Sequence, residues 1–170
     1  DLMVVIMVAV RVHSDSLGSS AWMFCFPSGI TISKNTRPEP TLSSFVMTTA
    51  KGSREYVTFL TIWEEIPAYP ILLELSKRID REVSIRDHYY LPKCLCLASS
   101  IPCFTFCRDW LRCVYTDCFE SPTASFSLDS AIAHLVKGVP LPSPGSQPLR
   151  VSLYNHPPFS NIVLPPSDSV

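Results

Sequence analysis

The sequence predicts an α+β fold in which one small sheet is flanked by helices. The first observation behind it is a stretch rich in β-branched and aromatic residues over 42–63, interrupted by a short turn containing Gly52. The second is a pair of segments with apolar residues at helical spacing, 67–82 and 104–118. With 170 residues, 46% of them hydrophobic, the chain is large enough to bury the core of one ordinary domain.

Charge and composition exclude some classes of partner and indicate a boundary. The formal net charge is −1, so no strong field draws the chain to nucleic acid or to an anionic membrane. Of the 16 prolines, nine follow Glu120, whereas most charged side chains precede it. We therefore expect a division near residues 120–125, with segments 1–20, 21–120 and 121–170.

The N-terminal elements are predicted to be short strands. Met3–Val10 is an apolar run too short for a membrane span, which needs about 20 residues. A buried strand is favoured over the end of a signal sequence, because valine and isoleucine favour strands. Trp22–Phe26 and Ile30–Ser33 are predicted as two further strands joined by a turn at Pro27–Gly29.

The clearest local unit is a hairpin. Its arms are Leu42–Thr49 and Arg54–Trp63, and Gly52 can supply the positive φ that a tight turn requires. Both faces of the second arm are largely apolar, so this strand should be central and covered on both sides.

The remaining elements are expected in the order helix, strand, helix. Pro67–Glu82 has an apolar stripe typical of an amphipathic helix, and Lys93–Ala98 resembles a short buried strand. A second helix is expected behind Ser100 as N-cap with Pro102 in its first turn. Its apolar positions are Phe104, Phe106, Cys107, Trp110, Leu111, Val114 and Cys118.

The tail combines a short helix, a proline-rich spacer and one strand. Ser130–Lys137 is predicted as an amphipathic helix, and Gly138–Gly145 as an extended linker because proline lacks an amide donor. Leu149–Tyr154 is predicted as a strand without a partner in the remaining Pro-rich residues. We expect this tail to lead into a second lobe that the chain does not contain. Pro140–Pro144 also fits a ligand for proline-binding modules, although a stiff linker is favoured.

The seven cysteines are expected to be reduced thiols rather than a disulfide framework, because their number is odd and five lie in apolar periodic runs. Cys94, Cys96, Cys107 and Cys118 are predicted to be buried and to bind no metal. Cys94 and Cys96 could offer two zinc ligands, but zinc needs four and the next cysteines lie at helical spacing.

No catalytic or cofactor-binding residues are predicted. The histidines at 13, 88, 134 and 156 lie far apart in sequence, and no hydrolase motif is present. None of the five glycines builds a phosphate-binding loop. Glu64 and Glu65 are expected to be a solvated helix entry rather than a catalytic pair. The motifs thus favour a non-catalytic module, with a small hydrolase left open only because a triad could assemble in three dimensions.

Four segments in this order resemble the upstream, longin-like part of DENN domain proteins. They are Phe24–Ile30, Phe45–Tyr56 with its Gly-Ser-Arg turn, Tyr90–Phe104 running into a helix, and Ile132–Gly145 followed by Val151–Leu153. Together they span residues 22–153. The resemblance implies a longin-like sheet flanked by helices, followed by the first strand of an incomplete second lobe.

The resemblance also implies a function. DENN modules act as guanine nucleotide exchange factors for Rab GTPases in membrane trafficking, without covalent catalysis or cofactor. We expect a cytoplasmic protein, peripheral on vesicle membranes, that neither inserts into the bilayer nor binds nucleic acid, and that is inactive in exchange without its second lobe. The alternative is a longin-like trafficking adaptor that binds a partner without exchange.

Overall fold

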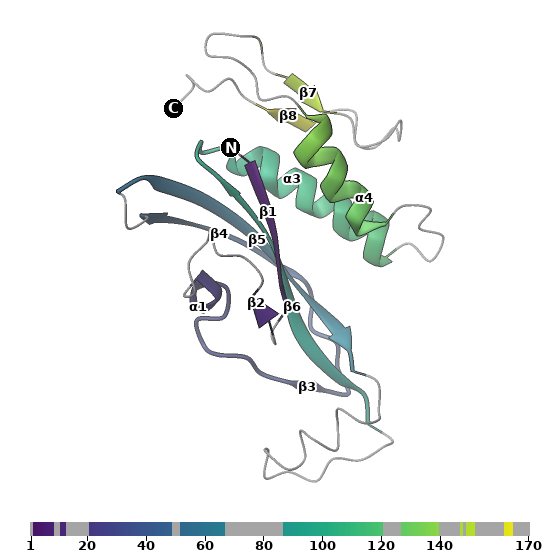
Figure 1. Cartoon of the computed structure of the whole chain (residues 1–170). Coiled ribbons are helices and arrows are strands. Elements are labelled where there is room, and N and C mark those ends of the chain that lie inside the picture. The colour runs from purple at the N-terminus through teal and green to yellow at the C-terminus, as the bar shows by residue number, and fades with distance from the viewer. Residues whose placement is uncertain are drawn as a thin grey trace. The chain divides into compact units, whose positions relative to one another are not determined.

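The computed structural model describes residues 2–8, 11–12, 21–48, 52–66, 87–120, 127–139, 147, 149–151 and 162–164. The chain divides into two compact units, each built from several segments. The first unit comprises residues 1–5, 42–59 and 96–170, and the second comprises residues 6–41 and 60–95. The fold is α+β, as the sequence predicts: a mainly antiparallel sheet accompanied by helices (Figure 1).

Six strands form the main sheet. They are β1 (Leu2–Val8), β2 (Arg11–Val12), β3 (Ser33–Lys34), β4 (Thr41–Thr48), β5 (Arg54–Glu65) and β6 (Tyr89–Ser99). The strand order is β2-β1-β6-β5-β4, and β3 pairs with β6 outside this path. The strand predicted at Met3–Val10 is therefore confirmed as β1, with slightly different ends.

The predicted hairpin is confirmed as β4 and β5, which are neighbours in the sheet. Gly52, in the connection between them, has a φ of 83°, a conformation that glycine adopts without steric cost. Six consecutive residues of β5, Val57–Ile62, are buried. This continuous burial confirms the prediction of a central strand covered on both faces.

The first unit places helix α3 (Phe104–Tyr115) against the hairpin. The rings of Tyr56 and Phe104 meet edge to face with centroids 5.7 Å apart, and Arg108 donates a 3.5 Å hydrogen bond to the Ser44 hydroxyl. The buried face of α3 carries five of the predicted apolar positions: Phe106, Cys107, Trp110, Leu111 and Val114. Phe104 and Cys118, also predicted for this face, are only half-buried.

The predicted start of this helix was wrong by three residues. Cys103, rather than Ser100, is the N-cap, and Pro102 precedes the helix. The residue before a proline is disfavoured from helical conformation, which works against a helix that begins at Ile101. Instead, the Ile101 amide donates a 3.1 Å hydrogen bond to the Ser99 hydroxyl, which turns the chain before α3 begins.

The first aromatic segment was predicted as a strand but forms helix α1 (Ala21–Cys25). Its burial shows why a helical turn is preferred. The neighbours Met23 and Phe24 are both exposed, whereas the neighbours Cys25 and Phe26 are both buried. A strand would alternate its side chains between faces, so this pairwise pattern is incompatible with one. Pro27 lies two residues beyond the last helical residue, Cys25, and the predicted turn at Pro27–Gly29 is present, with Gly29 at a φ of 79°.

The second short strand lies further along the chain than predicted. Ile30–Ile32 have no regular structure, and β3 contains only Ser33 and Lys34, which pair with Tyr90 and Tyr89 of β6. The strand predicted at Lys93–Ala98 is confirmed, but β6 begins four residues earlier. Tyr89 and Tyr90 therefore belong to the sheet and not to the loop predicted at Val83–Tyr90.

The helix predicted at Ser130–Lys137 is confirmed as α4 (Leu128–Ala133) continuing into a π-helical turn, His134–Gly138. Ser127 is its N-cap, since its hydroxyl accepts a 3.2 Å hydrogen bond from the amide of Ser130. Ala131 and Leu135 are buried four residues apart, as expected for an amphipathic helix.

The prediction that the last strand lacks a partner was wrong. Strand β7 (Leu149–Val151) pairs in antiparallel register with β8 (Ile162–Leu164), and α3 contacts β8 within the first unit (Figure 1). The partner is the Ile-Val-Leu run between two Pro-Pro pairs, a segment too short to stand out as a strand. The helix predicted at Pro67–Glu82 and the proline-rich linker core, 140–146, lie outside the described residues.

Candidate functional site

A network of polar side chains connects the residues at β3 with those just before β6 in the second unit. We call Lys34, Asn35, Glu65, Asp87 and His88 the polar corner. Asn35 and His88 exchange two hydrogen bonds: the Asn35 amide donates to the His88 carbonyl at 2.7 Å, and the His88 amide donates to Asn35 Oδ1 at 2.9 Å. Asn35 Nδ2 also donates to Asp87 Oδ1 at 2.9 Å. Asn35 adopts a φ of 59°, in the left-handed region that asparagine enters more readily than most residues.

Charged groups complete the polar corner. Lys34 Nζ lies 2.7 Å from Asp87 Oδ2, and His88 Nδ1 lies 2.6 Å from Glu65 Oε1. The hydrogen bond with Asp87 raises the pKa of Lys34, and the bonds from Lys34 and Asn35 lower the pKa of Asp87. Both shifts stabilise the charged forms of Lys34 and Asp87, so these two side chains form a structural ion pair within the corner.

Glu64 and Glu65 end β5 rather than opening a helix, which corrects the expectation for these residues. Each has a cationic or imidazole partner: Glu64 forms an ion pair with Lys93, and Glu65 contacts His88. Two carboxylates that each bind a separate partner at the surface do not form a general acid–base pair.

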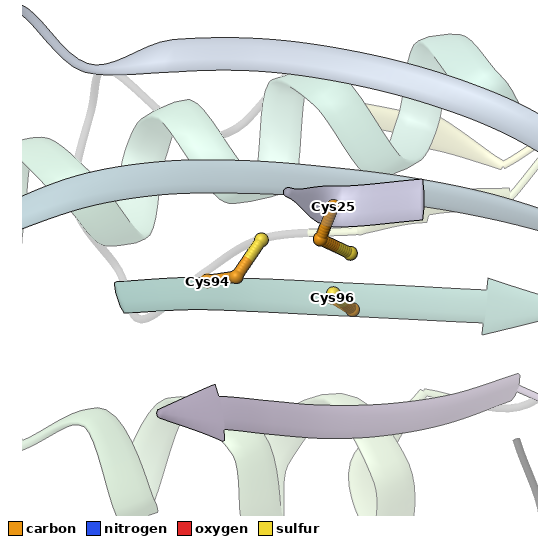
Figure 2. A group of neighbouring side chains, drawn as sticks. All are labelled: Cys25, Cys94 and Cys96. Atoms are coloured by element: carbon orange, nitrogen blue, oxygen red, sulfur yellow. The ribbon is translucent and has the colours of Figure 1, made fainter. Parts of the chain in front are cut away.

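Three buried thiols lie together, and we call Cys25, Cys94 and Cys96 the thiol trio. Their sulfurs lie within 4.8 Å of one another. Figure 2 shows Cys94 and Cys96 on β6 and Cys25 at the end of α1. Cys94 and Cys96 are two residues apart, so a strand directs both to one face. The sequence interpretation considered these two but missed Cys25, which lies some 70 positions earlier and shares no spacing motif with them.

The thiol trio offers three soft ligands, whereas a closed structural zinc site needs four. The Thr61 hydroxyl lies 3.7 Å from the Cys94 sulfur, so Cys94 has the hydrogen-bonded, buried environment of a core thiol. The prediction that Cys94 and Cys96 are buried is confirmed. That they bind no metal stays a prediction, which zinc analysis of protein purified under reducing conditions would decide.

A second thiol group lies at the start of α3, and we call Cys103 and Cys107 the dithiol. Their sulfurs are 3.6 Å apart, and the Cys107 amide donates to the Cys103 carbonyl at 3.0 Å. The side chains are 3% and 2% exposed. The hydrogen bond from Cys107 lowers the pKa of Cys103 to about 7, and the Ser99 hydroxyl adds to this effect. The same contact and burial raise the pKa of Cys107.

The other two thiols of this region are more accessible. Cys113 and Cys118 are half-buried, which corrects the prediction of a buried Cys118. Burial and the nearby Asp117 raise the pKa of both, that of Cys113 to about 12. None of the seven cysteines, all of which the structure describes, is part of a disulfide.

The histidines and glycines form no catalytic arrangement in the described part of the chain. His88 belongs to the polar corner, and His134 is half-buried in the π-helical turn. His13 and His156 lie outside the described residues. Within the described residues, no helix is long and apolar enough to cross a membrane.

The exposed large apolar side chains mark surfaces that a partner could contact. Met23, Phe24 and Ile30 lie in the second unit, whereas Val46 on β4 and Val136 lie in the first. β4 is the last strand of the described sheet order, so its outer backbone edge has no strand neighbour in the described sheet.

Comparisons with known families cover most of the chain. The uDENN domain model matches residues 12–62, which end in β5. The DENN (AEX-3) domain model matches residues 90–165, which extend from β6 through α3 and α4 to β8. The two matches follow one another in sequence order.

A curated relative agrees with these matches. The chain is 26% identical over 145 residues to "DENN domain and WD repeat-containing protein SCD1" of Arabidopsis thaliana. The alignment covers 85% of this chain and 11% of that protein, so the chain corresponds to a small part of the relative. No solved structure matches the chain.

Proposed function

Because the chain belongs to the DENN domain family, we propose that it is part of a guanine nucleotide exchange factor for Rab GTPases. The observation that carries this proposal is the succession of a uDENN and a DENN match on one α+β fold. The resemblance detected from the four sequence segments points to the same family.

The proposed activity is conformational and needs no reactive side chain. An exchange factor that binds the nucleotide-free GTPase more tightly than the loaded form favours nucleotide release by its differential affinity. The described residues fit this role, since they provide a packed sheet and helices but no arrangement for covalent chemistry. The buried face of α3 and the buried residues Val57–Phe59 give the first unit a packed core beneath such a surface.

We propose further that these 170 residues alone do not accelerate GDP release. The matching relative is a much longer protein, of which the chain covers 11%. Stable specific complexes bury roughly 1,200–2,000 Å² in total. A second lobe beyond residues 121–170 would supply the remaining contact area, and the chain itself would keep only weak affinity for the GTPase.

The proposed location is the cytoplasm, with peripheral association to vesicle membranes through the GTPase. The near-neutral charge and the thiol content support this placement. Residues 1–20, 21–120 and 121–170 would then be an N-terminal strand and loop, the longin-like lobe, and a linker with the first strand of the next lobe.

The test is release of fluorescent GDP from a panel of Rab GTPases. The 170-residue chain is compared with the longest natural product that contains it, at equal concentration. We expect the longer product to accelerate release from at least one Rab and the chain to have no effect. A Ras-type GTPase serves as the negative control, and magnesium chelation as the positive control for release.

Each other outcome has a definite meaning. Acceleration by the 170-residue chain equal to that of the longer product would show that further residues are dispensable. If neither protein accelerates release but the chain still binds a trafficking protein, the adaptor alternative replaces exchange. The exposed β4 edge is the surface that an adaptor of this fold would offer.

A further inference from the structure

The two sulfurs of the dithiol at the start of α3 lie in direct contact, which burial of two thiols in a core does not by itself require. Its sulfurs are 3.6 Å apart, whereas a disulfide needs about 2 Å. Residues four apart in a helix are separated by about 6 Å along its axis, within the roughly 4.4–6.8 Å that disulfides span between Cα atoms. Cβ atoms four residues apart on a helix are about 5–6 Å apart, whereas a disulfide needs about 3.5–4.5 Å, so bond formation also requires a local movement of the backbone at Cys103, which as N-cap lies outside the regular helix.

The surroundings distinguish the two sulfurs from each other. Cys103 is the N-cap of a twelve-residue helix, where unpaired amide groups favour negative charge. Cys107 lies one turn inside the helix, and its contact with Cys103 lowers the pKa of Cys103 while raising that of Cys107. These shifts favour Cys107 as the hydrogen-bond donor to a Cys103 thiolate. One thiol is thus prepared as a nucleophile and the other remains protonated beside it.

We propose that Cys103 and Cys107 are a redox-active pair that a small hydroperoxide converts into a disulfide within the first turns of α3. In the first step, the Cys103 thiolate attacks one oxygen of hydrogen peroxide and the O–O bond breaks. This gives a sulfenic acid on Cys103 and hydroxide, which takes a proton to become water. The Cys107 sulfur then attacks the Cys103 sulfur, the S–O bond breaks, and the departing hydroxide takes the Cys107 proton. Two thiol sulfurs are oxidised, and one peroxide is reduced to two waters.

Burial determines which oxidant the dithiol accepts. Both side chains are almost fully covered, so a bulky disulfide such as oxidised glutathione cannot align with either sulfur. A peroxide molecule is small enough to enter when the N-terminal turn opens locally. Such opening is expected at this end, because the first amides of a helix have no intrahelical acceptor and Ser100, just before it, is exposed.

The main experiment maps the order in which the native chain's thiols are oxidised. The reduced 170-residue chain is treated with one equivalent of hydrogen peroxide near neutral pH. Remaining thiols are then alkylated in denaturant, and the product is analysed by peptide mass mapping. We expect a Cys103–Cys107 crosslink, lighter by about 2 Da for the two hydrogens lost, to form before any other thiol reacts. Oxidised glutathione should give this crosslink at least about tenfold more slowly.

Cys113 and Cys118 provide the internal comparison, because they are more exposed than the dithiol but have raised pKa values. If either of them, or any member of the thiol trio, is oxidised before Cys103, accessibility rather than the paired geometry governs reactivity and the proposal is wrong. Absence of a Cys103–Cys107 crosslink at complete peroxide consumption would equally overturn it. These outcomes need no variant and do not depend on exchange activity.

Variants separate the two roles. Cys107→Ser should stop the reaction at a sulfenic acid on Cys103, which dimedone captures. Cys107→Ala also removes the hydrogen-bond donor, so it should in addition move the pH dependence of Cys103 oxidation up towards the ordinary thiol value of 9.0. Cys103→Ser should abolish both products. The matched control Cys113→Ser should leave crosslinking unchanged. An unaltered crosslink yield in Cys107→Ser, with another cysteine as partner, would contradict the assignment of Cys107.

Discussion

Helix α3 and the polar corner are held in place by different forces. On α3, five apolar side chains recur at helical spacing and are buried, and Trp110 is fully covered. At the polar corner, exposed or half-buried polar side chains from residues 34–35 and 87–88 hold two distant segments together by hydrogen bonds and an ion pair. Apolar periodicity is visible in a sequence, whereas a hydrogen-bonded contact across 50 residues is not. We therefore expect the stability of α3 to depend little on its polar side chains, and the stability of the polar corner to depend little on apolar side chains.

The largest effect is expected from Trp110→Ala. Trp110 is completely buried, so truncation leaves a large cavity and should lower the free energy of unfolding by about 3–5 kcal/mol. Its indole Nε1 has no hydrogen-bond partner in the described structure. Trp110→Phe should therefore cost only about 1 kcal/mol, since it keeps most of the volume and breaks no hydrogen bond.

Urea unfolding followed by circular dichroism measures both Trp110 variants. Equal destabilisation by alanine and phenylalanine would show that the indole N–H has a stabilising role, and that α3 is not held by packing alone.

An intermediate effect is expected at Asn35. Asn35→Ala removes the side-chain bonds to Asp87 and His88 and places an alanine at a φ of 59°, so it should cost about 2 kcal/mol. Asn35→Gly removes the same bonds without the backbone penalty and should cost roughly 1 kcal/mol less. Chemical denaturation of both variants gives the difference. If glycine is no better than alanine, the positive φ of Asn35 does not contribute to stability.

The smallest effect is expected from the Lys34–Asp87 pair, because the Lys34 side chain is half exposed and the ion pair lies at the surface. The lowered pKa of Asp87 means that its contribution is present above the ordinary value of 3.8 and is lost as the pH falls through the folded value. The raised pKa of Lys34 means that its contribution is present below 10.5 and is lost in stronger alkali.

Urea midpoints of the native chain and of Asp87→Asn measure this contribution. The two midpoints should differ slightly at neutral pH and converge in acid. A difference that persists below the folded pKa of Asp87 would show that the carboxylate charge is not what stabilises the corner.

Sequence reasoning predicted the elements whose side chains form continuous or periodic apolar patterns. The β4–β5 hairpin, β6, α3 and α4 were found because Val57–Ile62 and the stripe ending at Val114 are visible without tertiary contacts. It missed the short elements, because five residues at α1 and three at β8 carry too little pattern. It placed the α3 cap at Ser100, since a serine hydroxyl is the usual signal and the effect of Pro102 was underestimated.

The candidate sites were harder to predict than the fold. Cys25 lies next to Cys94 and Cys96 only in the tertiary structure, and the residues around Cys25 in the sequence contain no motif that predicts this contact. The Cys103–Cys107 spacing was recognised as helical, but its chemical meaning depends on where the helix starts. With Cys103 as N-cap, the two thiols differ in their electrostatic surroundings; one turn further inside the helix they would have been alike.

Strand β4 has one further consequence, for how the chain behaves in solution. Its residues, Thr41–Thr48, include no charged side chain and no proline, and Val46 is half exposed. Natural sheets usually protect their outer strands with lysine, proline or a bulge, and β4 has neither of the first two. An uncharged, β-prone segment at the border of a sheet is a template for pairing between molecules. If β4 is also the outer strand of the whole chain, as it is of the described sheet, self-association of the purified chain should rise with concentration, and Val46→Lys should reduce it.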